Sequence, residues 1–431
     1  MKKLLCAVLM VPTFIHAFVA SDINNPGGLV INAPGTYSYT GNGNIQVNAV
    51  TANQAVLINA SNVVFDLAAA QMTQQGSSAV IGIDIAPGVS NVTIQNGTVY
   101  AFNTQVQIEA GAVNPAITNF TVSRGSSGIN AVGTAMSPIT DLTLTNVTCM
   151  AADLDLTYAN AAGFINVLCQ GSGMNIVSCN NGTMVTCIVK GNQGDSATGL
   201  LLQDCLSWNI QNSNFDNHLG LMWGANGAYV YGSQVNTSGS HTFNGCSFSG
   251  NTGVSIARGL ALINTTSCIV SNCVMNANSS QTGYAIGCLV NNSVAGITTI
   301  STCSAQDNAV TGENPFGQGM GFSLSTTGLI ISNCASIGNS SAQGTGIGFL
   351  VASPSYSNTV TMCQAFDNST HGFVNNDSTT TFVQCAAIGQ NSQDYAGSFA
   401  PAYQTQHCLC IHGAGMLTAT SATNISFVAQ S

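Results

Sequence analysis

The sequence contains few charged residues. Asp, Glu, Lys and Arg together make up only 5% of its 431 residues, with five cations against 15 acidic residues and a formal net charge of −10 at pH 7. So few cations cannot form a basic stripe along a phosphate backbone, so nucleic acid is excluded as an expected partner. They are also too few for an enzyme that acts on polyanions. Asn, Ser, Thr and Gly take their place, which favours neutral polar contacts or packing against similar chains.

The sequence also lacks a long hydrophobic run, apart from its start. Two lysines, an apolar stretch over residues 4–15 and small residues at Ala17 and Ala20 predict a secretory signal peptide over residues 1–20. The stretch is short for a membrane span, so we expect no transmembrane segment after its removal. The expected location is therefore secreted or at the cell surface, with the periplasm as a further possibility. Removal would leave three fixed cations, which are Arg124, Lys190 and Arg258.

What the sequence does contain is a repeat in which a cysteine and an asparagine lie five residues apart. An apolar residue lies three positions before each cysteine, and successive cysteines lie 27, 30, 31 and 29 residues apart. These intervals are typical of solenoid repeats, in which each unit buries its apolar side only against its neighbours. The pairs are Cys246/Asn251, Cys273/Asn278, Cys303/Asn308, Cys334/Asn339 and Cys363/Asn368.

Each copy continues into a glycine and a short segment of alternating polarity, such as Gly321-Phe322-Ser323-Leu324. Period-two alternation in short runs, with no 3.6-residue period between them, predicts strands that coil in one direction. In such a coil, equivalent residues of successive turns lie about 4.8 Å apart. We therefore expect a column of asparagines at one bend and a column of cysteines at another. The cysteines would be buried reduced thiols or, alternatively, would form one or more disulfides.

The runs over residues 56–67 and 91–99, and the later Ile-x-x-Cys-x-x-x-x-Asn units, resemble the right-handed parallel β-helix proteins of the pectin-lyase-like superfamily. The resemblance covers most of residues 45–395. It implies an all-β, single-domain solenoid with a signal peptide (1–20), an N-terminal cap (21–50), a parallel β-helix (51–395) and a C-terminal cap (396–431). It does not specify an activity, because the superfamily contains lyases, hydrolases, epimerases, tailspikes and non-catalytic adhesins.

Uronate lyases of this superfamily combine a calcium-binding acidic cluster with an arginine or lysine base. Arg258 lies in a well-formed repeat, with Asp216 and His218 one turn earlier, so these three are candidates for acid–base chemistry. The competing interpretation is that His218 is one more bend residue of the asparagine column. The motif sets of galacturonases and the Asp-Pro-His-Asp signature of mannuronan epimerases are absent.

Hydrolysis of a neutral glycan needs two carboxylates at a controlled separation. Asp307 and Asp367 each lie four residues after a cysteine, two turns apart, which predicts roughly 9.6 Å between their backbones. They form a second candidate catalytic pair. The alternative is that both are solvated bend residues in place of asparagine.

Two groups of residues are candidate metal ligands. Asp153 and Asp155 share one face of an expected strand near Asp141, which makes calcium a possible cofactor. Cys408, Cys410 and His412 would share one face of a strand near the C-terminus and are candidate zinc or copper ligands, or packed thiols of a terminal cap.

Aromatic residues concentrate around Trp223, Tyr229 and Tyr231, and aromatic side chains on a long polar face bind sugar rings. The function expected first is a non-catalytic secreted or cell-surface protein that binds a polysaccharide or a surface protein through its lateral face. The competing hypothesis is a polysaccharide hydrolase or lyase. An enzyme is expected less than a binding protein.

Overall fold

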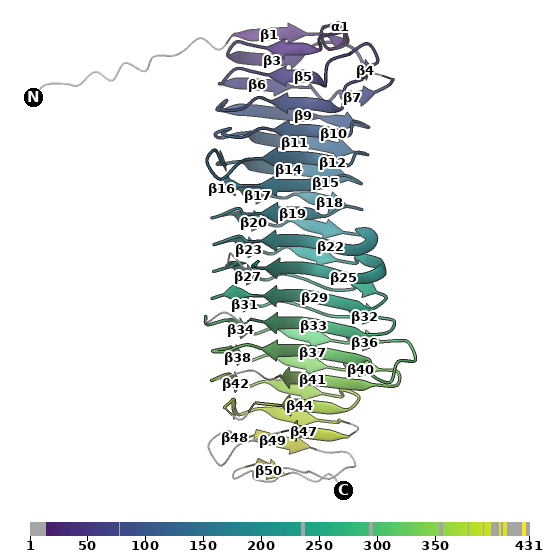
Figure 1. Cartoon of the computed structure of the whole chain (residues 1–431), viewed down its shortest axis with the longest axis vertical. Coiled ribbons are helices and arrows are strands. Elements are labelled where there is room, and N and C mark those ends of the chain that lie inside the picture. The colour runs from purple at the N-terminus through teal and green to yellow at the C-terminus, as the bar shows by residue number, and fades with distance from the viewer. Residues whose placement is uncertain are drawn as a thin grey trace, which may run out of the picture.

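The chain coils into a single rod of stacked turns (Figure 1). The computed structural model describes residues 14–76, 78–233, 238–292, 296–352, 357–377, 379–390, 392–397, 405–406, 408–411 and 425–427. Every strand pairing within these residues is parallel. The expected single-domain parallel β-helix is therefore confirmed.

The strands form three sheets and two isolated pairs, with one short helix, α1 (Ala20–Ile23), near the N-terminal end. Sheet A contains β1 (Ile15–Phe18), β3 (Gly35–Tyr39), β4 (Ile45–Val47), β6 (Val63–Asp66), β7 (Gln71–Gln74), β9 (Val92–Tyr100), β11 (Ala116–Ser123), β14 (Thr143–Met150), β17 (Gly163–Ile165), β18 (Leu168–Gln170), β20 (Thr183–Val185), β21 (Ile188–Lys190), β23 (Asn209–Gln211), β24 (Asn214–Asp216), β27 (Thr242–Asn244), β31 (Ile269–Ser271), β34 (Thr299–Ser301), β38 (Ile330–Ser332), β42 (Thr359–Thr361), β45 (Thr381–Val383) and β48 (Thr405–Gln406).

Sheet B contains β2 (Leu29–Ile31), β5 (Gln54–Ile58), β8 (Ile81–Ile85), β10 (Thr104–Ile108), β12 (Ser127–Val132), β15 (Asp153–Thr157), β19 (Met174–Val177), β22 (Gln193–Gln203), β25 (Leu219–Tyr231), β28 (Thr252–Gly253), β29 (Ile256–Ile263), β32 (Ser279–Ser280), β33 (Tyr284–Asn291), β36 (Ala309–Val310), β37 (Gln318–Ser325), β40 (Ser340–Ser341), β41 (Thr345–Val351), β44 (His371–Asn375) and β47 (Gln393–Gly397). Sheet C contains β35 (Ser304–Gln306), β39 (Ala335–Ile337), β43 (Gln364–Phe366), β46 (Ala386–Ile388), β49 (Cys408–Ile411) and β50 (Ile425–Phe427). The two pairs are β13 (Ile139–Thr140) with β16 (Ala159–Asn160), and β26 (Ser238–Gly239) with β30 (Thr265–Thr266).

One turn illustrates how the sequence forms the coil. Strand β31 ends at a left-handed bend at Asn272, after which Cys273 points inward, and a second bend at Ala277 precedes the buried Asn278. The chain then runs through β32 and β33 in sheet B before the next turn begins. Asparagine tolerates the left-handed conformation better than most residues, which explains why it recurs at these corners.

The predicted asparagine column exists and is buried. The Nδ2 amide of Asn251 donates to Oδ1 of Asn278 at 2.8 Å, and the same bond continues from Asn278 to Asn308 and from Asn308 to Asn339. The column ends at Asn368, whose backbone N–H donates to Oε1 of Gln390 at 2.9 Å. These bonds satisfy polar groups that would otherwise be costly to bury.

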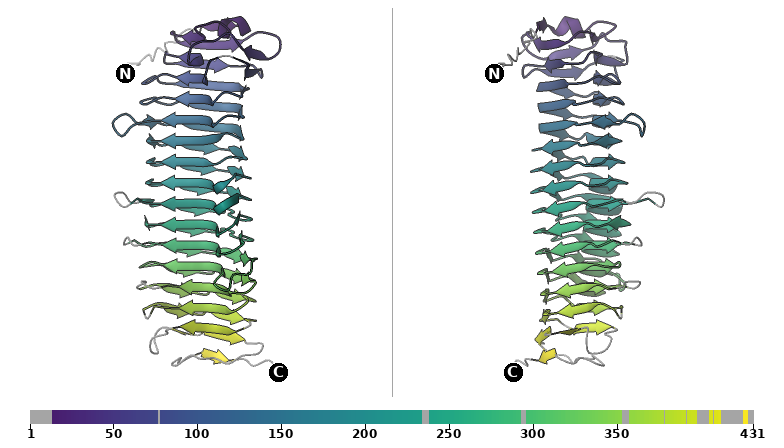
Figure 2. Two further views of the ribbon diagram at one scale, coloured as in Figure 1. Left: turned by 45° about the vertical axis from the view of Figure 1, so that its right-hand side comes forward. Right: turned by 90° about the vertical axis from the view of Figure 1, so that its left-hand side faces the viewer.

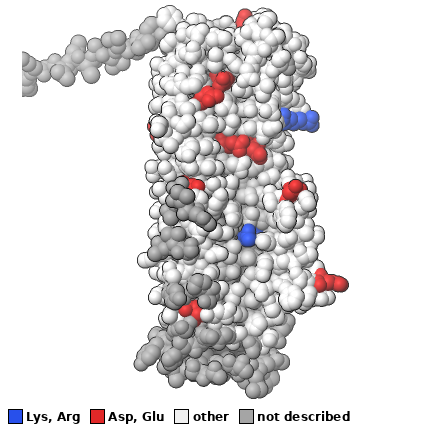
Figure 3. All heavy atoms as spheres, viewed as in Figure 1, with Lys and Arg blue, Asp and Glu red and all other residues white. Residues whose placement is uncertain are grey.

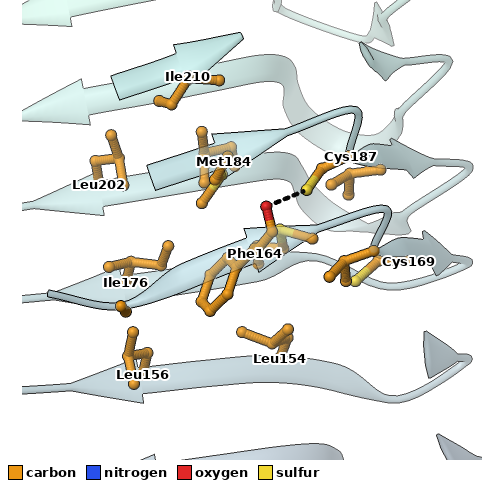
Figure 4. Close-up of a cluster of buried hydrophobic side chains, with 14 of the residues drawn as sticks. Leu154, Leu156, Phe164, Cys169, Ile176, Met184, Cys187, Leu202 and Ile210 are labelled. Carbon is orange, nitrogen blue, oxygen red and sulfur yellow. Dashed lines mark hydrogen bonds between the residues drawn. The ribbon is translucent and has the colours of Figure 1, made fainter. Parts of the chain in front are cut away.

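The interior is one continuous hydrophobic core in which like side chains stack on like. The rings of Phe322, Phe349 and Phe373 stack in sequence at 4.8 and 4.9 Å between centroids, and Tyr395 continues the stack at 5.0 Å. Figure 4 shows the same principle further up the rod, where Leu154, Ile176 and Leu202 of sheet B face the side chains of Phe164 and Met184.

Cysteines also form an inward column. The register of the strands places seven of them on successive turns, which are Cys246, Cys273, Cys303, Cys334, Cys363, Cys385 and Cys408. All 14 cysteines whose side chains the structure describes are buried and free, which agrees with the packed-thiol alternative. Burial raises the pKa of Cys179 to about 12 and that of Cys187 to about 11.

The parallel stack reaches further at both ends than the predicted body over residues 51–395. Strand β1 pairs with β3 inside the predicted signal peptide, and Phe18 stacks on Phe65 at 5.1 Å. Strands β49 and β50 continue the stack inside the predicted C-terminal cap. The signal peptide itself stays a prediction, because residues 1–13 lie outside the described residues. Among those that are described, no helix has the length and apolar content needed to cross a membrane.

Candidate functional site

The outward face of sheet B carries a column of polar side chains in the N-terminal half of the rod. Alternation in β8 buries Ile83 and Ile85 and turns Asp84 outward. Asp84 is followed on successive turns by Gln107, Asn130, Asp155 and Asn175, and we call these five residues the polar ladder. Parallel in-register pairing alone brings them together, because they lie 20 to 25 residues apart in the sequence.

Hydrogen bonds order this ladder. Nδ2 of Asn130 donates to Oε1 of Gln107 at 2.9 Å, and Nδ2 of Asn175 donates to Oδ1 of Asp155 at 2.8 Å. The second oxygen of Asp155 accepts from the hydroxyl of Ser127 at 2.8 Å. The result is a row of oriented amides and carboxylates, which is suited to hydroxyl-rich ligands because each group offers directional donors or acceptors.

Asp84 differs from the other members of the ladder. Its Oδ1 is buried with no hydrogen-bond partner among the described residues. Burial, followed by repulsion from Glu109, raises the pKa of Asp84 to about 6. Glu109 follows β10 directly, and its backbone N–H donates to the carbonyl of Ile85. A carboxyl group of this kind can exchange a proton near neutral pH.

Figure 3 shows how few charges the surface carries. Acidic atoms gather at two places in the upper half of this view, at the level of β10 and β15, and a single basic group lies near its centre. The surface between them is uncharged, which agrees with the expected preference for neutral polar contacts.

Two tyrosines continue the face of the ladder. Tyr229 and Tyr231 of β25 lie one turn beyond Leu201 and Gln203, and their half-buried rings are 5.5 Å apart between centroids at 49°. Burial and the neighbouring Asp204 raise the pKa of Tyr231. Their outward position is the one that the sequence predicted for binding residues.

Arg258 of β29 lies on the turn after these tyrosines. It pairs in register with Asn226, and its Nη1 donates to Oδ1 of Asn226 at 3.3 Å. Its Nε is buried without a hydrogen-bond partner among the described residues, and burial lowers the pKa of its guanidinium group. Arg258 therefore has a donor available for a ligand on this face.

Trp223 does not join the tyrosine pair. The register of β25 against β22 shifts between Gly194 and Ser196, so Leu221, Met222 and Trp223 form a bulge. Trp223 is 64% exposed there. It lies six residues before Tyr229, which is roughly 20 Å along a strand.

The other predicted catalytic residues lie apart from this face. Asp216 belongs to β24 in sheet A, where Oδ1 accepts from the hydroxyl of Ser247 at 2.8 Å and from the backbone N–H of Ser249 at 2.6 Å. His218 is buried, and its Nδ1 accepts from the backbone N–H of Asn192 at 3.2 Å. This is the bend position of the asparagine column, as the alternative interpretation expected.

Asp307 and Asp367 are exposed residues at left-handed bends after β35 and β43. Gly338 occupies the turn between them, and a Cβ atom there would lie 2.6 Å from Oδ1 of Asp307. The two carboxylates thus lie two turns apart on one corner, as predicted. The structure brings neither of them to the polar ladder or to Arg258.

No group of three or more His, Cys, Asp or Glu side chains within the described residues is arranged to hold a metal ion. Asp153 and Asp155 do share one face, but Oδ1 of Asp153 accepts from the backbone N–H of Gly173 at 2.9 Å. Asp141 lies at a left-handed bend before β14. Cys408 belongs to the buried thiol column, whereas the side chain of Cys410 and all of His412 lie outside the described residues.

Sequence reasoning missed the polar ladder and Glu109. A signal was present, because the Ile-Gly-Ile-Asp-Ile run over 81–85 and the Thr-Gln-Val-Gln-Ile run over 104–108 both alternate with a polar residue at the fourth position. Aligning these turns required a register that the Cys-x-x-x-x-Asn repeat, first noted at Cys246, does not supply.

No protein-family model matches the chain, and no curated protein matches its sequence. Solved structures that resemble it include the A-module of the mannuronan C-5 epimerase AlgE4 of Azotobacter vinelandii, with 13% identity, a TM-score of 0.38 and coverage of 94% of this chain and 99% of that chain. The periplasmic alginate epimerase AlgG has 8% identity and a TM-score of 0.37 over 96% of this chain and 83% of its own. PfbA, a surface adhesin of Streptococcus pneumoniae, has 9% identity and a TM-score of 0.39 over 91% and 93%.

All of these TM-scores are below 0.5, so the likenesses assign no activity to this chain. The strand pairing of the chain itself is the stronger observation. Its all-parallel, turn-on-turn sheets fit the right-handed β-helix of the pectin-lyase-like superfamily, which the sequence resembles.

Proposed function

We propose that this protein is a secreted or cell-surface β-helix protein that binds carbohydrate along the outward face of sheet B. The observation that carries the proposal is the half-buried pair Tyr229 and Tyr231 on the same face as the polar ladder. Aromatic rings cover the apolar faces of sugars, and ordered amides and carboxylates accept and donate to their hydroxyls.

The charge of the surface supports a neutral or weakly charged glycan. Arg258 is the cation next to the tyrosines, and the chain has five cations in all. A densely anionic polymer would be repelled by the net charge of −10. A surface protein rich in neutral polar groups is the other partner class that this face fits.

Binding to a glycan array, followed by calorimetry with the full chain, tests the proposal. We expect the double variant Tyr229→Ala/Tyr231→Ala to weaken binding at least about tenfold, since each ring contributes on the order of 1 kcal/mol beyond its buried area. Tyr284→Ala is the matched control, because Tyr284 is 43% exposed at the start of β33. Unchanged affinity in the double variant would place the glycan elsewhere. No binding to any glycan would favour a protein partner.

An enzyme remains the second candidate because of Asp84. Its raised pKa suits a general acid, and Glu109 lies diagonally across one turn, roughly 8 Å away between Cα atoms. That separation is within the range of inverting glycosidases. An assay for new reducing ends and unsaturated products separates the two functions. Turnover that is lost in Asp84→Asn and in Glu109→Gln would establish the enzyme and reject the binding-only proposal.

A further inference from the structure

The strands of sheet A present a second face that the proposed function does not use. From β14 to β45, ten successive turns each place two residues outward on the first strand of the turn. We call these 20 positions the hydroxyl face. One column contains Thr143, Gly163, Thr183, Asn209, Thr242, Ile269, Thr299, Ile330, Thr359 and Thr381, and the other contains Thr145, Ile165, Val185, Gln211, Asn244, Ser271, Ser301, Ser332, Thr361 and Val383.

None of the 20 residues is charged and none is buried. Eleven carry a hydroxyl group and five are Ile or Val. In Figure 2, right, the side that carries the labels β17 to β42 in Figure 1 is turned to the viewer, and its strands lie directly above one another. Ile165, Ile269 and Ile330 expose 51%, 47% and 42% of their surface there.

Three properties of this face point to the same partner. It repeats about every 4.8 Å, and a second copy of the chain has the same repeat. Its threonines, isoleucines and valines are stiff at χ1, so they lose little side-chain entropy in a contact. The net charge of −10 drives copies apart wherever acidic groups face each other, so a contact is favoured where there are none.

We propose that the hydroxyl face is an interface between two copies of this chain, packed side by side through the same face of each. Ten turns at about 4.8 Å, three residues wide, cover roughly 500 Å² on each copy, or about 1,000 Å² in total. This area is at the lower limit for a specific interface, so the pair forms and separates with concentration. A self-complementary contact of this kind closes at two copies.

Sedimentation velocity of the full chain, from about 1 to about 100 µM, tests the proposal. We expect a monomer at the lowest concentration and a dimer at the highest. In the double variant Ile269→Lys/Ile330→Lys, four lysines of a dimer would meet at the contact, so the dimer should be lost. The control Leu221→Lys/Tyr284→Lys adds the same charge at exposed positions of sheet B and should dimerise as the unmodified chain does. Circular dichroism verifies that both variants are folded.

Two results would overturn the proposal. One is a monomer at every concentration, and the other is a dimer that survives in Ile269→Lys/Ile330→Lys. Measuring glycan binding in the same two variants shows what the face does in the first case. A monomer whose glycan binding fails only with lysines on the hydroxyl face would assign this face to carbohydrate, and the tyrosine face of sheet B would then be tested separately.

Discussion

The imidazole Nδ1 of His218 accepts the backbone N–H of Asn192 at 3.2 Å, and the backbone N–H of His218 in turn donates to Oδ1 of Asn251. A histidine thus performs the acceptor role that asparagines perform on the following turns. His241 repeats the arrangement at the next corner, where Nδ1 accepts the backbone N–H of Trp208 at 3.3 Å. Both rings must be neutral at Nδ1 to accept these bonds.

These two histidines predict a loss of stability in mild acid. Burial lowers the pKa of each to about 4, from an ordinary 6.5. The unfolded chain therefore binds protons first, and the stability present above pH 6.5 is lost as the pH falls towards 4. The loss is at most roughly 3 kcal/mol for each histidine. Urea unfolding between pH 4.5 and 7.5 measures it.

His218→Asn is the matched variant for this prediction, because it restores the residue of the column. It should remain folded and show a shallower dependence on pH than the unmodified chain. The same slope in both proteins would mean that His218 does not contribute to the acid sensitivity.

The asparagine column predicts that Asn308 is important for stability. Its Oδ1 accepts from both the backbone and the side chain of Asn278, and its Nδ2 donates to Asn339. Asn308→Ala leaves these buried groups without partners, which should reduce the free energy of unfolding by roughly 3 kcal/mol. Chemical unfolding measures it. Asn272→Ala, at an exposed bend with a single side-chain bond to Asn244, should cost no more than about 1 kcal/mol. Equal losses would contradict the special role of the buried column.

The thiol column predicts that most cysteines are inert in the folded protein. Hydrogen bonds of opposite effect with the thiols on either side, together with burial, raise the pKa of Cys303 to about 12. Thiolate is then scarce at pH 8, and the reagent has no path to the sulfur. Of the 16 cysteines, 14 are buried and free, so at most two should react with Ellman's reagent before unfolding and the rest only in guanidinium chloride. Rapid reaction of many thiols in the native protein would show that the core opens.

Asp84 predicts an opposite dependence on pH. Its pKa is raised to about 6 in the fold, from 3.8, so the folded chain keeps a proton that the unfolded chain has released. The stability contributed by this carboxyl is present below pH 3.8 and is lost as the pH rises through 6. Because Asp84 is partly exposed, its effect should be only about 1 kcal/mol. Asp84→Asn should therefore be more stable than the unmodified chain at pH 7, and Glu109→Gln should give part of this gain. A destabilised Asp84→Asn would show that the ionised carboxylate has a partner in solution.

The sequence predicted the fold through its most regular part. Cysteine and asparagine five residues apart defined the register from Cys246 onwards, and the structure extends this spacing to Ser213 and His218 and to Cys385 and Gln390. The side chains change there, although the geometry does not. A search for identical residues therefore stopped too early.

The candidate site was harder to predict because it depends on which turns are neighbours. Asp84 and Asn130 approach one column only through intervals of 23 residues, whereas Tyr229 follows Leu201 by 28. Loops of different lengths absorb these differences at the corners. Tyr229 and Tyr231 were predicted because they are close in sequence. Asp84 and Glu109 were not, because no local pattern links them.

The buried amide column also affects how such a chain can change its length. Asn308 bonds to Asn339 through the same atoms by which Asn278 bonds to Asn308. Duplication or deletion of the 31 residues between two such asparagines therefore joins ends that already match. Rods of this kind can evolve by the gain or loss of whole turns, while an insertion of any other size must be accommodated in a loop at a corner.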